Sequence, residues 1–271
     1  MKIVRSEFLK IFTLRTWWVL IIIMFAYVGF TAAILGGGMM LASDLAGSAL
    51  LPSQSSAETA QMTYSTALSV GYVFPVLLGA LSITGEYRFG TIIPTFLLTP
   101  KRSAVLWAKL LTQFVMGLIY GVIGFATTIL ASVFFLMRAE QNIGLTDIST
   151  WGMIVRGILA MGIWAMIGVG LGVLIRNQAA AIIIAIAFTQ FLEPILRFVA
   201  LFNEATVTIS KFLPGAASDA IGGASVYSMT SFNGTGSATS LPWWGGALVL
   251  LGYAGLTALI GYWTRWTRDA A

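Results

Sequence analysis

The chain has 271 residues, of which 58% are hydrophobic and only 9% are charged. A soluble globular protein carries roughly 25% charged residues, so this composition excludes a soluble fold and predicts a single all-α membrane domain over 1–271. The formal net charge is +5, and the absence of cysteine and histidine excludes disulfides, thiol chemistry and imidazole-based metal or acid–base sites.

The amino-terminal segment, 1–16, predicts a basic amphipathic helix that lies in the inner headgroup layer of the membrane. Two interpretations of this helix are open. It either anchors the topology alone, or it is an elbow helix that also touches a cytoplasmic partner. Apolar residues recur in it at helical spacing: Val4, Phe8, Ile11, Phe12 and Leu14. Basic residues lie elsewhere on the helix: Lys2, Arg5 and Lys10.

Six segments are long and apolar enough to cross a bilayer. A hydrocarbon core about 30 Å thick requires roughly 20 helical residues, because an α-helix rises 1.5 Å per residue. The third segment is longer than this and is expected to tilt or to project beyond the bilayer. The predicted spans are 17–41, 62–83, 105–137, 151–175, 179–200 and 243–263.

The basic residues predict the orientation of these spans. All but four of the fifteen Lys and Arg residues lie on the face that carries both termini. The positive-inside rule therefore predicts a multi-pass protein of the cytoplasmic (inner) membrane with both termini in the cytoplasm. Basic residues beside hydrophobic runs usually set orientation, so the net charge does not indicate a nucleic-acid partner. The four exceptions are Arg138, Arg156, Arg197 and Lys211.

A long extracellular connection, 201–242, precedes the last span. Residues 203–226 are moderately apolar and are expected to pack short helices on the outer surface of the membrane. The tract that follows, 228–240, is rich in Gly, Ser, Thr and Asn and predicts a flexible loop.

Three charged residues lie inside the predicted spans. Glu193 and Arg197 are four residues apart in the order that favours an intrahelical ion pair, about 22 Å and 28 Å along the fifth span. Pro194 is expected to disturb the helix there. The pair is either a mutually neutralised feature of the outer headgroup level or part of an outer gate. Arg156, about 7 Å into the fourth span, is expected to snorkel to the outer surface.

Glycines at small-xxx-small spacing occur in the third and fourth spans. Such spacing lets helix backbones approach closely, and we expect the contacts to lie within the subunit rather than at a dimer face. The residues are Gly117, Gly121, Gly168, Gly170 and Gly172.

The segment 84–103 lies between the second and third spans and predicts a short cytoplasmic helix with an apolar face between charged ends. Thr91 is a suitable residue to cap this helix, Pro94 is tolerated in its first turn, and Pro100 prevents its continuation.

This segment resembles the signature of type 2 ABC transporter permeases. The family pattern runs Glu-x-x-x-Gly-Thr, a Leu-Leu pair, a Pro, a basic residue and a downstream Lys. It is matched here by Glu86, Gly90, Thr91, Leu97, Leu98, Pro100, Arg102 and Lys109. One departure is Pro94, where the family often has a polar or acidic residue.

The resemblance implies a coupling helix that sits in a cleft of a nucleotide-binding subunit. It also implies two permease chains, identical or related, with two cytoplasmic ABC ATPase chains. The residues expected to contact the ATPase are Glu86, Arg88, Gly90, Thr91, Leu97, Leu98, Pro100, Lys101 and Arg102.

The chain contains no Gly-x-x-x-x-Gly-Lys-Ser/Thr loop, the motif that binds the phosphates of ATP. ATP and Mg are therefore expected on the partner ATPase. No cofactor, metal or catalytic residue is expected in this chain. The resulting hypothesis is active export of an amphipathic or hydrophobic compound, such as a drug, antibiotic, peptide or lipid.

Two alternative functions are open. A passive channel, secondary carrier or sensor subunit has the same hydropathy, but carriers usually hold broken helices or charges near the midplane, and the depth estimates place none there. An intramembrane lipid-modifying enzyme or protease is disfavoured because no nucleophile or metal motif occurs in the sequence.

Overall fold

The computed structural model describes residues 2–46, 56–138, 142–200, 204–224 and 241–266. Within these ranges every regular element is a helix. Six helical segments are long and apolar enough to cross a membrane, which confirms the predicted helical fold with six candidate spans. They are Thr16–Gly38, Glu58–Arg88, Arg102–Arg138, Ile148–Leu174, Gln178–Ala200 and Trp243–Thr264.

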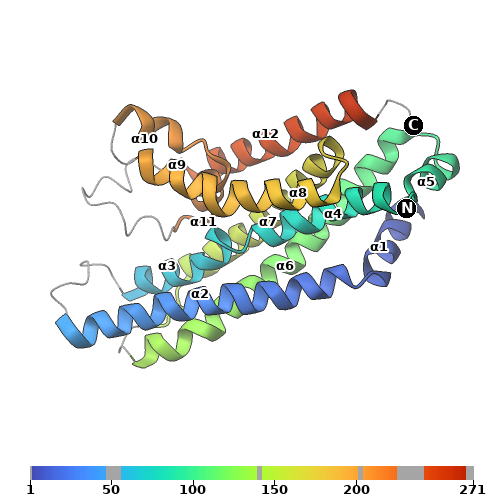
Figure 1. Ribbon diagram of the computed structural model, residues 1–271. Coiled ribbons are helices and arrows are strands. Elements are labelled where there is room, and N and C mark those ends of the chain that lie inside the picture. The colour runs from blue at the N-terminus through green and yellow to red at the C-terminus, as the bar shows by residue number, and fades with distance from the viewer. Residues whose placement is uncertain (1, 47–55, 139–141, 201–203, 225–240, 267–271) are drawn as a thin grey trace.

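Most of the helices run along the long axis of the molecule, and shorter ones cover its two ends (Figure 1). In chain order they are α1 (Lys2–Thr13), α2 (Thr16–Ala46), α3 (Ser56–Ser69), α4 (Val73–Arg88), α5 (Ile92–Leu98), α6 (Arg102–Arg138), α7 (Ile148–Leu174), α8 (Gln178–Ile186), the π-helix η2 (Ala187–Leu192), α9 (Glu193–Ala200), α10 (Glu204–Ser210), α11 (Pro214–Gly222), α12 (Trp243–Gly261) and the π-helix η4 (Tyr262–Trp266).

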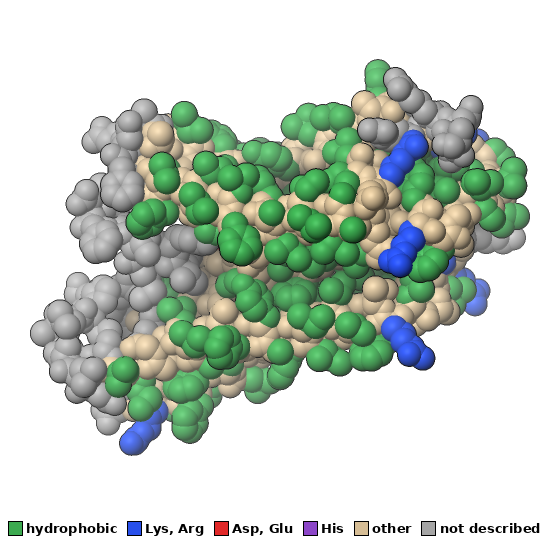
Figure 2. Space-filling view, viewed as in Figure 1, with side chains coloured by type: hydrophobic (Ala, Val, Ile, Leu, Met, Phe, Trp, Pro, Cys, Tyr) green, Lys and Arg blue, Asp and Glu red, His purple; other side chains and the backbone are tan. Residues whose placement is uncertain are grey.

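Helices α4 and α7 form the centre of the bundle. In the most apolar stretch of each candidate span, 78% of the Glu58–Arg88 residues and 67% of the Ile148–Leu174 residues are buried, against 22% for Thr16–Gly38 and for Gln178–Ala200. Because the outer helices are mostly unburied, their hydrophobic side chains lie on the surface of the molecule, and Figure 2 shows them spread over the visible face. These outer helices carry the apolar surface that faces a lipid or another apolar partner.

Glycines allow the central helices to touch through their backbones. A Cβ added to Gly168 would lie 2.1 Å from the Val76 carbonyl oxygen of α4, and one added to Gly117 would lie 2.5 Å from the Met161 carbonyl oxygen of α7. Gly121, Gly170 and Gly172 likewise face α7, α12 and α4. The prediction that these glycines pack within the subunit is confirmed.

Three of the candidate spans are not continuous α-helices. The sixth, Trp243–Thr264, ends in the π-helix η4. The second is interrupted at 70–72, between α3 and α4. The fifth widens into η2, where the Glu193 amide bonds to the Phe188 carbonyl, five residues back. The next residue, Pro194, has no N–H to continue this pattern, so the Thr189 carbonyl receives no helical bond. This carbonyl oxygen instead accepts a hydrogen bond from the Tyr72 hydroxyl, at 2.9 Å.

The short helices define two ends of the bundle. Helices α1 and α5 lie with η4 at one end, which we call the α5 end, and α9, α10 and α11 lie at the other, the α11 end (Figure 1). The connection 201–242 contains the expected short helices, but α11 is largely buried against α3, α7 and α12 instead of lying on an outer surface. A glycine in α12 permits this close packing. A Cβ at Gly246 would collide with the Ala217 carbonyl of α11, so only glycine lets the two helices approach this closely. The tract 228–240 lies outside the described residues.

Candidate functional sites at the two ends of the bundle

The α5 end presents an apolar surface with basic residues, and the exposed residues that the structure describes there include no acidic one. Leu97 and Leu98 are 78% and 86% exposed, and Phe89 and Ile93 are also exposed, whereas Ile92 is buried in a core cluster that includes residues of α6 and α7. The stretch 87–102 contains no Asp or Glu. We call Arg88, Phe89, Ile93, Leu97, Leu98 and Lys101 the α5 surface. It is a compact hydrophobic patch with a positive rim.

The structure separates the nine residues predicted to contact a partner into two groups. Seven are exposed around α5, Arg102 is partly buried, and Glu86 is buried. Arg102 donates a hydrogen bond to the Trp266 carbonyl at 3.2 Å and lies 5.1 Å from the Phe96 ring, so it fastens η4 to this end. The seven exposed residues are Arg88, Gly90, Thr91, Leu97, Leu98, Pro100 and Lys101.

The Gly90–Thr91 pair forms the turn between α4 and α5. Gly90 has a φ of +68°, a left-handed conformation that favours glycine. The Gly90 amide bonds to the Tyr87 carbonyl and the Thr91 amide to the Glu86 carbonyl, which together form a Schellman motif. Thr91 precedes α5 as expected, but its side chain makes no capping hydrogen bond. The pair therefore sets the angle at which α5 leaves α4.

Beneath α5 lies a ring of four charges, Glu7, Lys10, Glu86 and Lys109, which we call the Lys109 cluster. Lys10 is partly exposed and the other three are buried. Lys109 Nζ donates to Glu7 Oε2 at 2.6 Å and to Glu86 Oε1 at 2.8 Å. Lys10 Nζ donates to Glu7 Oε1 and to the same Glu86 oxygen, both at 2.8 Å. The two positive and two negative charges balance. The ring joins α1, α4 and α6.

Lys10 extends the cluster to α5. Its Nζ also donates to the Thr95 hydroxyl at 3.3 Å, so one ammonium group bonds to α1, α4 and α5 together. The other oxygen of Glu86, Oε2, is buried and accepts no hydrogen bond from the described residues. Glu86, expected at a partner surface, instead faces the interior, where it joins the root of α5 to α1 and α6.

The cluster changes the pKa values of the two α1 residues. Burial raises the pKa of the Glu7 carboxyl, but the charge of Lys109 and hydrogen bonds from Lys10 and Lys109 outweigh it and bring the pKa below the ordinary 4.5. Burial lowers the pKa of Lys10, but its bonds to Glu7 and Glu86 outweigh this and bring the pKa above 10.5. Both groups therefore stay charged across the physiological range.

Acidification is expected to destabilise the protein through Glu7. A lowered folded-state pKa gives stability that is present above the unfolded value, 4.5, and is lost as the pH falls through the folded value. The pH dependence that Lys10 contributes has the opposite sign, because its folded-state pKa is raised. Its contribution to stability is present below pH 10.5 and is lost only above that pH. The thermal midpoint in detergent, measured from roughly pH 7 to pH 3, should fall less steeply for Glu7→Gln than for the wild type.

The matched control for this measurement is Asp147→Asn, because Asp147 is a carboxylate at the start of α7, at the other end of the bundle, and its side chain makes no capping hydrogen bond. It should keep the steep acid limb of the wild type. An equally steep limb in Glu7→Gln would contradict a charge-dependent role for Glu7.

The α11 end contains a second buried cluster, Glu193, Arg197 and Asp219, which we call the Arg197 cluster. Arg197 donates to Glu193 Oε1 at 3.0 Å, and this confirms the predicted intrahelical pair. It also donates to Asp219 Oδ2 of α11 at 2.7 Å. The Ser69 hydroxyl of α3 donates to the other Asp219 oxygen at 3.1 Å. One arginine therefore ties α9 to α11, and Asp219 ties α11 to α3.

Glu193 also caps α11 from another helix. Its Oε1 accepts hydrogen bonds from the Gly215 and Ala216 amides in the first turn of α11, and its Oε2 accepts the Tyr72 hydroxyl at 3.3 Å. A carboxylate at this position is favourable because the free amides and the helix dipole both attract negative charge. Gly215 leaves no room for a side chain beside Glu193.

Trp164 of α7 also holds α11. Its indole Nε1 donates to the buried Ser218 hydroxyl at 3.0 Å, and its ring stacks on Tyr72 at 4.3 Å between centroids. The Arg197 cluster, Ser218 and Tyr72 thus lie around one buried short helix. Of these contacts, the sequence predicts only the Glu193–Arg197 pair.

Four residues of these clusters lie outside the predicted sites: Glu7, Lys10, Lys109 and Asp219. Lys109 is nevertheless part of the family pattern, and Lys10 is one of the basic residues of the predicted amino-terminal helix. Glu7 lies three residues before Lys10, and this helical spacing is a detectable but weak signal for an ion pair. Asp219 has no local signal of this kind. It lies 22 residues from Arg197, and only the insertion of α11 brings the two together.

No protein-family model matches the chain, and no curated protein matches it.

Proposed function

We propose that this chain is the transmembrane permease subunit of an ATP-driven exporter, with the α5 end in the cytoplasm. The observation that carries the proposal is the α5 surface, an exposed apolar helix with a basic rim at the end of a six-span bundle. Leu97 and Leu98 have the exposure expected of anchors that a partner buries. In this proposal they seat α5 in a cleft of a cytoplasmic ABC ATPase.

The Lys109 cluster supports a route from that surface into the spans. A shift of α5 acts on Lys10 through Thr95, and Lys10 shares Glu86 with Lys109 of α6. Buried ion pairs of this kind resist separation, because a lone charge in the interior is very unfavourable. We therefore propose that α1, α4 and α6 move with α5 when the ATPase closes on ATP.

The proposed assembly holds two ATPase chains, which bind ATP and Mg, and a second permease copy. The mostly unburied outer helices, α2, the α8–α9 span and α12, offer the apolar area for lipid and for that copy. The substrate class remains an amphipathic or hydrophobic compound such as a drug, antibiotic, peptide or lipid. The chain itself is not proposed to be an enzyme.

Cross-linking from α5 tests the proposal directly. The sequence has no cysteine, so a single Leu98→Cys thiol takes a photo-crosslinker at one defined place. In native membranes it should capture a soluble protein with a phosphate-binding loop, identified by mass spectrometry. Leu130→Cys, 71% exposed on α6, is the matched control and should capture none.

Alanine variants then measure the strength of the contact. Leu97→Ala/Leu98→Ala should reduce co-purification of the ATPase about tenfold or more, because two buried leucine anchors are removed. Leu130→Ala should leave it unchanged. Leu98 adducts that contain no ATPase, or normal co-purification of the double variant, would overturn the proposed docking role.

A secondary carrier is the second candidate function, and one observation favours it. The breaks in the second and fifth spans lie beside the Arg197 cluster, and interrupted spans beside buried charges are typical of ion-coupled carriers. Transport by the native complex with a catalytically inactive ATPase discriminates between the two. Continued transport would favour the carrier, and its loss would favour the exporter.

A further inference from the structure

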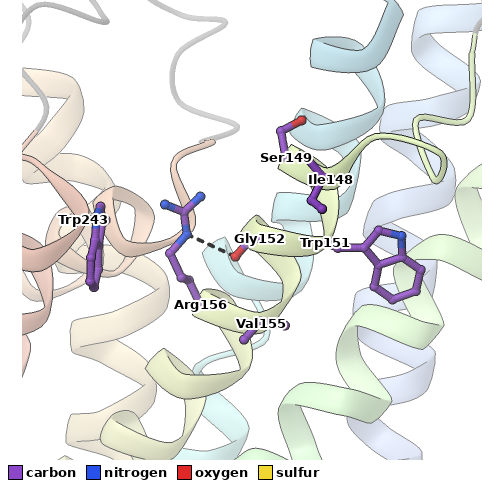
Figure 3. Close-up of a pocket in the computed structure, with 7 residues that line it drawn as sticks. All are labelled: Ile148, Ser149, Trp151, Gly152, Val155, Arg156 and Trp243. Atoms are coloured by element: carbon purple, nitrogen blue, oxygen red, sulfur yellow. Dashed lines mark hydrogen bonds between the residues drawn. The ribbon is translucent and has the colours of Figure 1, made fainter.

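An open depression of about 580 Å³ lies at the α11 end, between the first turns of α7 and the start of α12. Its lining is almost wholly apolar and includes Trp151, Val155 and Trp243. The one charged residue in the lining is Arg156, whose guanidinium stands between α7 and Trp243 (Figure 3). The depression therefore combines a single cation with an apolar wall.

Arg156 has no acidic partner among the residues that the structure describes. Its Nε donates to the Gly152 carbonyl at 3.1 Å, one turn nearer the start of α7, which directs the guanidinium towards the α11 end as the snorkelling prediction expects. No described carboxylate lies within 4.0 Å of it, in contrast to Arg197, which has two such carboxylates.

Four of the five guanidinium donors of Arg156 thus make no hydrogen bond to the described residues and are available to an external acceptor. The side chain is partly buried, so water compensates its charge less well than at a fully exposed site. An anionic group with two oxygens matches the planar fork of arginine better than a single acceptor does. Phosphate has this geometry.

The apolar wall distinguishes a lipid phosphate from a free one. Trp151 and Trp243 are 52% and 53% exposed and stand at the starts of two candidate spans, where tryptophans usually mark the headgroup level of a bilayer. A phosphate held there by Arg156 would place the chains of a phospholipid along Val155 and the two indoles. A free phosphate ion would leave that apolar surface uncovered.

We propose that this depression binds one phospholipid through its phosphate group, with Arg156 as the phosphate ligand and Trp151 and Trp243 as the apolar wall. The site is independent of the proposed export function. It is a fixed lipid site at the α11 end, separate from both the Arg197 cluster and the α5 surface.

Native mass spectrometry of the detergent-purified chain, titrated with phosphatidylglycerol, tests the proposal. The wild type should hold one phospholipid tightly, and Arg156→Gln should weaken its binding about tenfold, as expected when charge-assisted hydrogen bonds are lost. Arg138→Gln, which removes an exposed arginine at the same end, is the matched control and should bind like the wild type. Equal binding by Arg156→Gln and the wild type would overturn the proposal.

Two further measurements separate the remaining explanations. Inorganic phosphate should not displace the bound phospholipid, and displacement by it would show an ion site in place of a lipid site. Trp243→Ala keeps the charge and removes part of the wall, so it should weaken binding severalfold even if Arg156→Gln fails to fold. Unchanged binding by Trp243→Ala would also overturn the proposal.

Discussion

Lys109→Met is expected to destabilise the protein by about 3–5 kcal/mol, because it removes the buried ammonium group and leaves Glu7 and Glu86 with only the partly exposed Lys10 between them. Lys109 is 1% exposed and bonds to Glu7 and Glu86 at 2.6 and 2.8 Å. Methionine fills a similar volume, so the loss reflects charge more than packing. The thermal midpoint in detergent should fall by on the order of 10 °C.

A second variant tests whether this loss of stability is electrostatic, because it also neutralises the two carboxylates that Lys109 binds. Glu7→Gln/Glu86→Gln/Lys109→Met should recover at least about half of the lost midpoint, since replacing a buried ionic group by neutral residues is often tolerated. Lys101→Met removes an exposed lysine close to α5 and should change the stability by less than about 0.5 kcal/mol. A triple variant no more stable than Lys109→Met would refute the electrostatic explanation.

Arg197→Gln is expected to release α11 from the bundle. Without the guanidinium, Glu193 and Asp219 are two buried carboxylates facing each other across the contact between α9 and α11. Their repulsion and lost pairing favour the state in which α11 moves outward and water reaches both groups. A buried reporter on α11 should therefore become accessible.

Ser218→Cys provides that reporter, because Ser218 is fully buried and the sequence contains no other thiol. A water-soluble maleimide should label this cysteine roughly 100-fold faster in the Arg197→Gln background, as expected for a loss of about 3 kcal/mol in local stability. Arg138→Gln, an exposed arginine at the same end, should leave the rate unchanged.

This labelling also decides between the two interpretations of the Glu193–Arg197 pair. If the cluster is an outer gate, the labelling rate of Ser218→Cys, in the complex that keeps Arg197, should rise when the ATPase partner turns over. If it is only a neutralised structural pair, the rate should be the same with and without turnover. A rate for Arg197→Gln equal to that of the Ser218→Cys parent would contradict any role of Arg197 in holding α11.

Much of the architecture follows from sequence patterns that are local. The six spans were predictable because hydrophobic length is a property of one segment, and the Glu193–Arg197 pair was predictable because helical residues four apart share a face. The disturbance at Pro194 followed from its missing N–H, and the glycine spacing identified where helices touch.

The sequence by itself thus determined the helical class, the number of candidate spans and the exposed α5 segment. Only the tertiary structure decided that Glu86 faces Lys109 instead of the exterior, that Glu7 completes that ring from 102 residues away, and that α11 is buried so that Asp219 meets Arg197. The reason is physical: a hydrophobic pattern shows which segments leave water, but a buried charge is partnered by whichever helix packs beside it, and that neighbour lies far away in the chain.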